Sequence, residues 1–147
     1  MKTLPRMYFL LTVWMLTACN AGPEITFHPS QNPERQDAPY SEAVQVDRLL
    51  FLAGQIGMDP ATGQPAQGDI KAQTRQTLEN IKRVLEYHKT SLDKVVKCTV
   101  ILADINDFTT FNEVYVTYFP NKPARTTFAA ASLAAGALIE IDVIAVK

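Results

Sequence analysis

The hydrophobic period of this chain changes abruptly between residues 69 and 102, and that change restricts its architecture. From Asp69 onwards, apolar and small side chains recur at steps of three and four, which predicts an amphipathic helix of about five turns. Over residues 95–102 the period becomes two, as in a strand covered well on one side. The helical face comprises Ile70, Thr74, Thr77, Leu78, Ile81, Val84, Leu85 and His88. The covered strand face comprises Val96, Cys98, Val100 and Leu102.

Further strands and a second helix are expected on either side of this region. Asn106 is suited to cap a helix that ends before Pro120. The turn residues of DPATG, 59–63, favour a hairpin. The second helix carries an aromatic stripe, which we interpret mainly as core, formed by Phe108, Phe111, Tyr115, Tyr118 and Phe119. The remaining strands are expected at residues 43–46, 48–56, 124–132 and 138–146.

The resulting order, β-β-α-β-α-β-β, predicts an α+β fold with both helices on one face of a sheet. Along residues 138–146, Glu140 and Asp142 point away from an apolar face. The apolar face comprises Ile139, Ile141, Val143 and Ala145. Because the opposite sheet face is also partly apolar, we expect an oligomer rather than a monomer.

The first 18 residues are typical of an export signal. Lys2 and Arg6 precede a short apolar run that ends at Cys19, and its last residues, LTAC, resemble a bacterial lipobox. We therefore expect Cys19 to be lipidated and the protein to be anchored in a membrane on the periplasmic side. An uncleaved anchor or an ordinary signal peptide are the alternatives. Residues 19–39, which hold four prolines, are expected to form a tether to a domain over residues 40–147.

Charge, cysteine count and histidine spacing argue against nucleic-acid binding, an intramolecular disulfide and a metal site. Without residues 1–18 the chain has 12 basic and 15 acidic residues, so no basic surface for nucleic acid is expected. Cys98 is left without a cysteine partner and is interpreted as a small core residue. His28 and His88 are far apart in sequence, and no metal site is expected.

The most informative polar residues are Arg125, in KPARTTFAA, and Glu140, in LIEIDVIAV. Both lie inside segments that otherwise have the composition of strands. A partly buried guanidinium requires a partner, and the residues alone leave two interpretations open. In the first interpretation, Arg125 and Glu140 form an ion pair. In the second, Arg125 binds a substrate carboxylate while Glu140 holds a water or a proton.

Longer motifs carry a resemblance to a known family. The segments LAGQIGMDPATG, VVKCTVILADINDFTTFNEVY and PARTTF, the last followed by GALIEIDVIAV, are similar to the Rid family of reactive intermediate deaminases, whose archetype is RidA. The similarity runs from Tyr40 to Val146. Its most specific mark is PAR followed fifteen residues later by the glutamate of IEI, here Arg125 and Glu140.

This resemblance implies a homotrimer of chorismate-mutase-like subunits with clefts between neighbours. It implies hydrolysis of enamines and imines, such as 2-aminoacrylate, to 2-keto acids and ammonia without a cofactor. Arg125 is expected to bind the substrate carboxylate and Glu140 to position the attacking water. The expected substrate-binding positions are Tyr40, Gly54, Asn112 and Thr127. Ala53 and Thr127 depart from the archetype, which has serine and cysteine at these positions.

Export raises a question about the substrate, since the family's substrates arise on cytoplasmic enzymes. Two alternatives keep the trimer but not the catalysis. In the first alternative, the cleft binds a stable carboxylic acid, such as a 2-keto acid. In the second, the protein is a membrane-tethered, holdase-like molecule.

Overall fold

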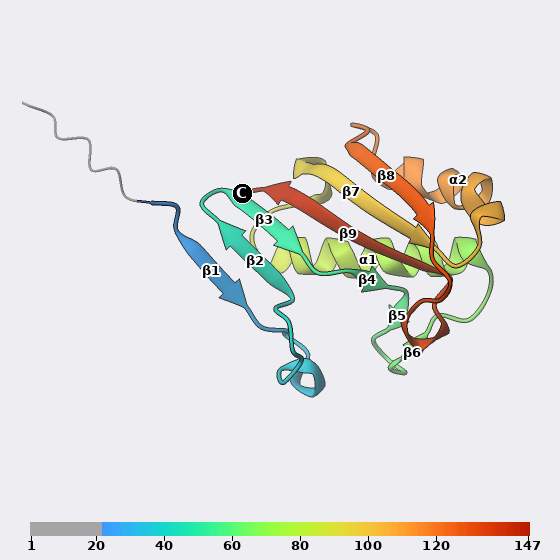
Figure 1. Cartoon of the computed structure of the whole chain (residues 1–147), viewed down its shortest axis with the longest axis horizontal. Helices are drawn as coiled ribbons and strands as arrows, with labels where there is room; N and C mark the ends of the chain where they lie inside the picture. Colours follow the sequence, from blue (N-terminus) through green and yellow to red (C-terminus); the bar gives the residue numbers. More distant parts are fainter. Residues whose placement is uncertain (1–21) are drawn as a thin grey trace, which may run out of the picture.

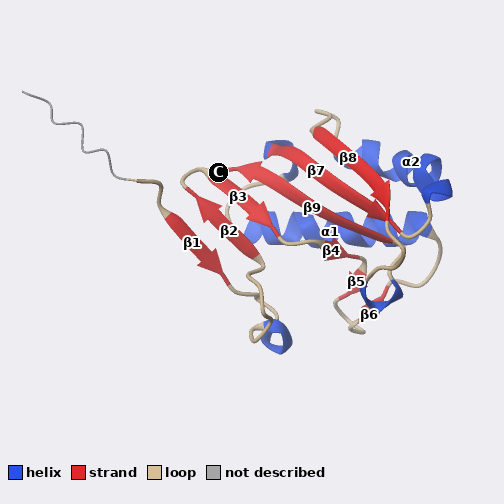
Figure 2. Ribbon diagram, viewed as in Figure 1, coloured by secondary structure: helices blue, strands red, loops and turns tan. Residues whose placement is uncertain are grey.

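The computed structural model describes residues 22–147, so the expected signal over residues 1–18 and the lipidated Cys19 lie outside the described residues. The described chain forms a seven-stranded mixed sheet with two helices on one face, and a two-stranded hairpin beside it (Figure 1 and Figure 2). This arrangement confirms the predicted α+β class and the placement of both helices on the same side of the sheet.

The bounds of the elements are as follows. The main sheet contains β1 Ile25–His28, β2 Ala43–Val46, β3 Leu49–Leu52, β4 Gln55–Ile56, β7 Val95–Leu102, β8 Ala124–Ala129 and β9 Ile139–Val146. The hairpin contains β5 Met58–Asp59 and β6 Gln64–Pro65. The helices are α1 Ile70–Tyr87 and α2 Phe108–Tyr118. Short 3₁₀ turns occur at η1 Pro33–Arg35, η2 Leu92–Lys94, η3 Ile105–Asp107 and η4 Ala134–Gly136.

The strand order across the main sheet is β1-β2-β3-β9-β7-β8, and β4 pairs with β9 beyond the end of β3. All neighbours are antiparallel except β7 and β8. Parallel neighbours need a crossover connection, and α2 supplies it. The crossover brings α2 against the outermost strand, β8 (Figure 1).

Helix α1 forms where the helical period predicts it. The Asp69 side chain caps its first turn by accepting a 3.0 Å hydrogen bond from the Ala72 N–H. Thr74 and Thr77 are tolerated on the buried face because their hydroxyls donate to backbone carbonyls one turn earlier. Every residue of the predicted face is buried. Within residues 22–147, no helix is long and apolar enough to span a bilayer.

The core lies between the helices and the inner face of the sheet. Strand β9 supplies every second residue to this core, from Ile139 to Ala145, as predicted. Glu140 and Asp142 lie on the opposite, open face of the sheet and are half-buried. Ile25, Phe27, Leu49 and Phe51 are exposed large hydrophobic residues of β1 and β3. An apolar open face of this kind agrees with the expectation of an oligomer.

Two local predictions were wrong. The register between β7 and β9 shifts at Val95, so that Val95 is buried and Val96 is 46% exposed, contrary to the simple alternation. Asn106 does not cap α2 with its side chain. Instead the Asp104 carboxylate accepts from the Asn106 N–H and starts η3, from which α2 continues at Phe108.

Part of the segment expected to be a tether is a strand, because residues 25–28 form β1 and pair antiparallel with β2. Pro23 and Pro29 flank this strand rather than interrupt it, so they do not remove a donor from its ladder. The DPATG turn joins β5 to β6, and Gly63 adopts a φ of 66° there. An earlier hairpin joins β2 to β3 through Asp47 and Arg48.

Candidate functional site

Arg125 projects from β8 towards the helices. It is paired with Cys98 of β7, a core residue, and neighbouring residues of paired strands share a face. Its Nη1 donates a 2.8 Å hydrogen bond to Oδ1 of Asn112 on α2. Its guanidinium carbon lies 4.6 Å from the ring centroid of Tyr115, 5.1 Å from that of Phe111 and 5.6 Å from that of Phe108. Helix α2 therefore contacts the guanidinium through one amide and three aromatic rings.

Glu140 lies on the other side of the sheet. It is paired with Ile101 of β7, whose side chain alternates with the core residues Val100 and Leu102. Within residues 22–147, neither Arg125 nor Glu140 takes part in an ion pair. An ion pair between Arg125 and Glu140 of one chain is thus not formed, which corrects one of the two interpretations of the sequence. Their fifteen-residue spacing could not reveal this, because it does not fix the face of β8 on which Arg125 lies.

A cavity of about 350 Å³ lies beside the Glu140 side chain. Its lining residues are Tyr40, Ala53, Gly54, Ala134 and Glu140. Gly54 lets the carboxylate approach the backbone, since a Cβ on this residue would lie 1.9 Å from Glu140 Oε1. Three of the predicted site residues, Tyr40, Gly54 and Glu140, therefore meet at one cavity.

The other predicted residues gather on the helix side. Asn112 contacts Arg125 directly, and Thr127 follows Arg125 on the same face of β8, paired with Val100. The Thr127 hydroxyl is buried and has no hydrogen-bond partner in the described part of the chain. In one chain, Arg125, Asn112 and Thr127 are thus separated by the sheet from the cavity beside Glu140.

The contact between the aromatic stripe and Arg125 was not predicted from the sequence. Phe111 and Tyr115 are core residues as predicted, but they also face the guanidinium, and Phe108 is 39% exposed. Phe108, Phe111 and Tyr115 are three and four residues apart and so share one helix face. This spacing could have indicated an aromatic surface that contacts a cation. The crossover between parallel strands, which brings α2 against β8, could not be foreseen from that spacing.

Neutral groups surround the guanidinium at physiological pH. Burial raises the pKa of the Cys98 thiol to about 11. Burial and the adjacent Cys98 thiol also raise the pKa of the Tyr115 phenol. Neither group supplies a thiolate or phenolate nucleophile near pH 7. Among the described residues, no group of three or more metal-ligating side chains is assembled.

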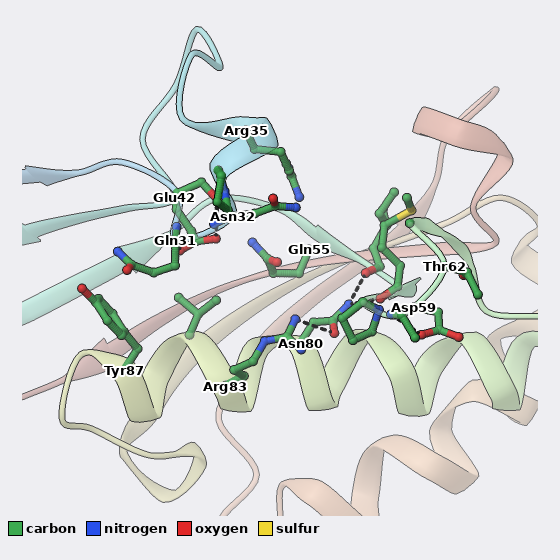
Figure 3. A pocket seen from close by; sticks show the side chains of 18 residues that line it. Gln31, Asn32, Arg35, Glu42, Gln55, Asp59, Thr62, Asn80, Arg83 and Tyr87 are labelled. Atoms are coloured by element: carbon green, nitrogen blue, oxygen red, sulfur yellow. Dashed lines mark hydrogen bonds between the residues drawn. The ribbon is translucent and has the colours of Figure 1, made fainter.

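A larger cavity of about 830 Å³ lies between α1 and the segment that contains η1 (Figure 3). Asn80 lines it and donates to the carbonyls of Ile56 and Met58, while Arg83 donates to the Asn80 side chain. Arg35 lines the same cavity and donates a 2.5 Å hydrogen bond to the Tyr40 hydroxyl. None of the predicted site residues lines it, and we place the candidate site at Arg125 and at the cavity beside Glu140.

Comparison with known proteins gives consistent results. The family model described as Endoribonuclease L-PSP matches residues 31–147. The 2-iminobutanoate/2-iminopropanoate deaminase of Homo sapiens is 46% identical over 110 residues, which cover 74% of this chain and 80% of that protein.

Two solved structures share the fold. One is a Yersinia pestis protein, YyfA, described as a protein of unknown function of the conserved Rid protein family. It superposes with a TM-score of 0.77 at 38% identity, covering 84% of this chain and 100% of that one. The other is Escherichia coli TdcF with bound serine, with a TM-score of 0.70 at 35% identity, covering 75% of this chain and 89% of that one.

Proposed function

The chain belongs to the Endoribonuclease L-PSP family, and on that premise we propose that it hydrolyses reactive enamines and imines, such as 2-aminoacrylate, to 2-keto acids and ammonia. The observation that carries the proposal is an Arg125 guanidinium with no carboxylate partner in residues 22–147. The 46% identical human relative bears the name of an imine deaminase, which supports the same chemistry.

Arg125 binds the substrate carboxylate in this proposal. A guanidinium presents paired N–H donors that match the two oxygens of a carboxylate, and Nη1 is already oriented by Asn112. Thr127 offers a buried hydroxyl without a partner on the same face of β8. A small 2-imino acid held here has its imine carbon fixed relative to the protein.

Glu140 orients the water that attacks the imine carbon. An enamine first tautomerises to the imine, water then adds across the C=N bond, and loss of ammonia leaves the 2-keto acid. The carboxylate accepts a proton from the attacking water and returns one to the departing nitrogen. Because positioning is the main requirement of this step, the site needs no cofactor and no covalent nucleophile.

The complete site is formed between two copies of the chain. Arg125 and Glu140 lie on opposite faces of one sheet. A substrate that contacts both residue types therefore lies between Arg125 of one copy and Glu140 on the open sheet face of a neighbouring copy. Homotrimers are typical of this family, and the exposed hydrophobic residues of β1 and β3 provide a surface for such packing. We assign Tyr40 and Gly54 to the Glu140 half of the site, and Asn112 and Thr127 to the other half.

Binding without catalysis is the second candidate. Arg125 with Asn112 and Thr127 forms a carboxylate-binding group that does not require Glu140, and the E. coli structure contains a bound amino acid. RNA cleavage, which the family description suggests, is not proposed, because 12 basic and 15 acidic residues beyond residue 18 provide no basic excess. A holdase-like role receives no support from a particular group of residues.

We also propose an exported location. Lys2, Arg6 and the apolar run before Cys19 support a lipoprotein signal, with the domain held at the periplasmic side of a membrane. The imines it hydrolyses would then arise outside the cytoplasm.

Mixed trimers test the proposed site. Arg125→Ala and Glu140→Gln should each give folded trimers that lose most imine hydrolysis, measured with 2-aminoacrylate produced in the assay. Trimers assembled from an equal mixture should regain about a quarter of the parental activity, because three quarters of them are mixed and each mixed trimer holds one intact site of three. Parental activity in either single variant would contradict the assignment, and no recovery on mixing would place both residues in one chain's site.

A further inference from the structure

Within residues 22–147, every contact of the Arg125 guanidinium is with an uncharged group. The groups are the Asn112 amide and the three rings of Phe108, Phe111 and Tyr115, which we call the neutral cradle. No ion pair involves Arg125 in the part of the chain that the structure describes. A half-buried arginine without a carboxylate is unusual, because removing a cation from water costs energy that an anion normally offsets.

Two acidic residues of the surrounding elements are directed elsewhere. Glu113 follows Asn112 on α2 but forms a 2.6 Å ion pair with Lys71 of α1. Asp142 of β9 is paired with Thr99 and therefore lies on the open face of the sheet, opposite Arg125. Cys98 and Tyr115, which flank the guanidinium, stay protonated because their pKa values are raised.

The neutral cradle can hold the cation without neutralising it. An aromatic face attracts a guanidinium through its quadrupole, and stacking against the face restricts the plane of the group. The Asn112 oxygen fixes one nitrogen by a hydrogen bond but carries no net charge. The guanidinium is thereby oriented, while its positive charge remains available to a ligand.

We propose that the neutrality of this cradle is a functional device, which keeps the charge of Arg125 unpaired so that the carboxylate of a small 2-imino or 2-keto acid supplies the counter-charge. Asn112 and Phe108 are positioning residues in this device, since they act through Arg125. The inference rests on the proposed role of Arg125 as the carboxylate-binding residue.

Asn112→Asp tests the device directly, because it replaces the amide by a carboxylate of the same shape 2.8 Å from Nη1. The new ion pair should raise KM for the imine, and Kd for pyruvate measured by calorimetry, by about tenfold or more. The rise in KM should exceed any fall in kcat, and the melting temperature should be unchanged or higher. Asn106→Asp is the matched control, since it adds the same charge just before the same helix without touching Arg125, and it should bind pyruvate as the parent does.

Phe108 provides a second variant, which should fold because its side chain is 39% exposed. Phe108→Leu removes a ring face and should raise KM about two- to fivefold with little change in kcat, whereas Phe108→Tyr should restore the parental KM. Tyr87→Leu, at an exposed aromatic residue of the other helix, is the control.

The outcomes separate this inference from the function on which it rests. Parental pyruvate affinity in Asn112→Asp, or unchanged KM in Phe108→Leu, would overturn the neutral cradle while leaving the deaminase proposal in place. A parent protein that neither hydrolyses imines nor binds pyruvate would overturn both.

Discussion

At the scale of single residues, the close approach of Gly54 to Glu140 is the tightest constraint on the candidate site. The φ of Gly54 lies outside the left-handed region, so its backbone conformation is open to other residues. The requirement for glycine comes from space, because the Glu140 carboxylate occupies the volume that a Cβ would fill. The position of the carboxylate and the absence of a side chain at residue 54 are therefore linked.

Gly54→Ala should displace the Glu140 side chain while leaving the fold intact. The atom in the way is the end of a half-buried side chain, which can move, so the melting temperature should change little. Imine hydrolysis should fall by about a hundredfold, since a catalytic group moved by about 1 Å commonly costs that much. Gly22→Ala, where nothing lies within 4 Å of the new Cβ, is the control for kinetics and thermal unfolding. Unchanged activity in Gly54→Ala would argue against Glu140 as the residue that positions water.

At the scale of elements, two histidines meet where the end of β1 lies beside the end of α1. His28 at the end of β1 and His88 at the end of α1 have ring centroids 4.5 Å apart. Both Nε2 atoms are buried without a hydrogen-bond partner in the described part of the chain. Burial lowers the pKa of His88, and the neighbouring His28 and Lys147 lower it further, while Glu42 opposes them.

This lowered pKa predicts that acid weakens the fold. Below pH 6.5 the unfolded chain binds a proton at His88 more readily than the folded chain, so the free energy of unfolding falls as the pH drops towards the folded pKa. The melting temperature of the parent should therefore decrease between pH 7.5 and pH 5.5. His88→Phe keeps a ring against His28 but cannot titrate, and it should show a smaller decrease over the same interval. Equal decreases in the two proteins would rule out this role of His88.

At the scale of the whole molecule, fewer residues separate the proposed anchor from the sheet than the sequence suggested. Because β1 starts at Ile25, residues 20–24 alone separate Cys19 from the main sheet. A short connection of this kind would hold the domain near the surface to which Cys19 is attached.

Cys19→Ser tests the location of the protein. If Cys19 carries lipid, the variant should leave the membrane fraction or retain residues 1–18, as judged by fractionation and by the mass of the protein. Processing and fractionation identical to the parent's would exclude lipidation at this residue. Gly22→Ala, three residues further along the chain, is a control for changes near the cleavage position.

Sequence alone determined the features that depend on local periodicity. The buried face of α1 and the alternation along β9 follow from spacings within one segment, and the steric and hydrophobic rules behind them need no distant partner. Arg125 and Glu140 were found in the same way, since a charge within an apolar strand is visible locally. The class of fold follows from the order of such segments.

The tertiary structure alone decided how these segments face one another. The alternation along β9 already directed Glu140 away from the core, but only the pairing of β8 with β7 places Arg125 on the helix side, and no spacing within residues 124–129 encodes that choice. The crossover between the parallel strands β7 and β8 brings α2 next to Arg125. Part of the aromatic stripe of α2 thereby contacts the guanidinium and forms the neutral cradle. The shift at Val95 and the addition of β1 likewise depend on a partner strand, because pairing energy is shared between residues far apart in sequence.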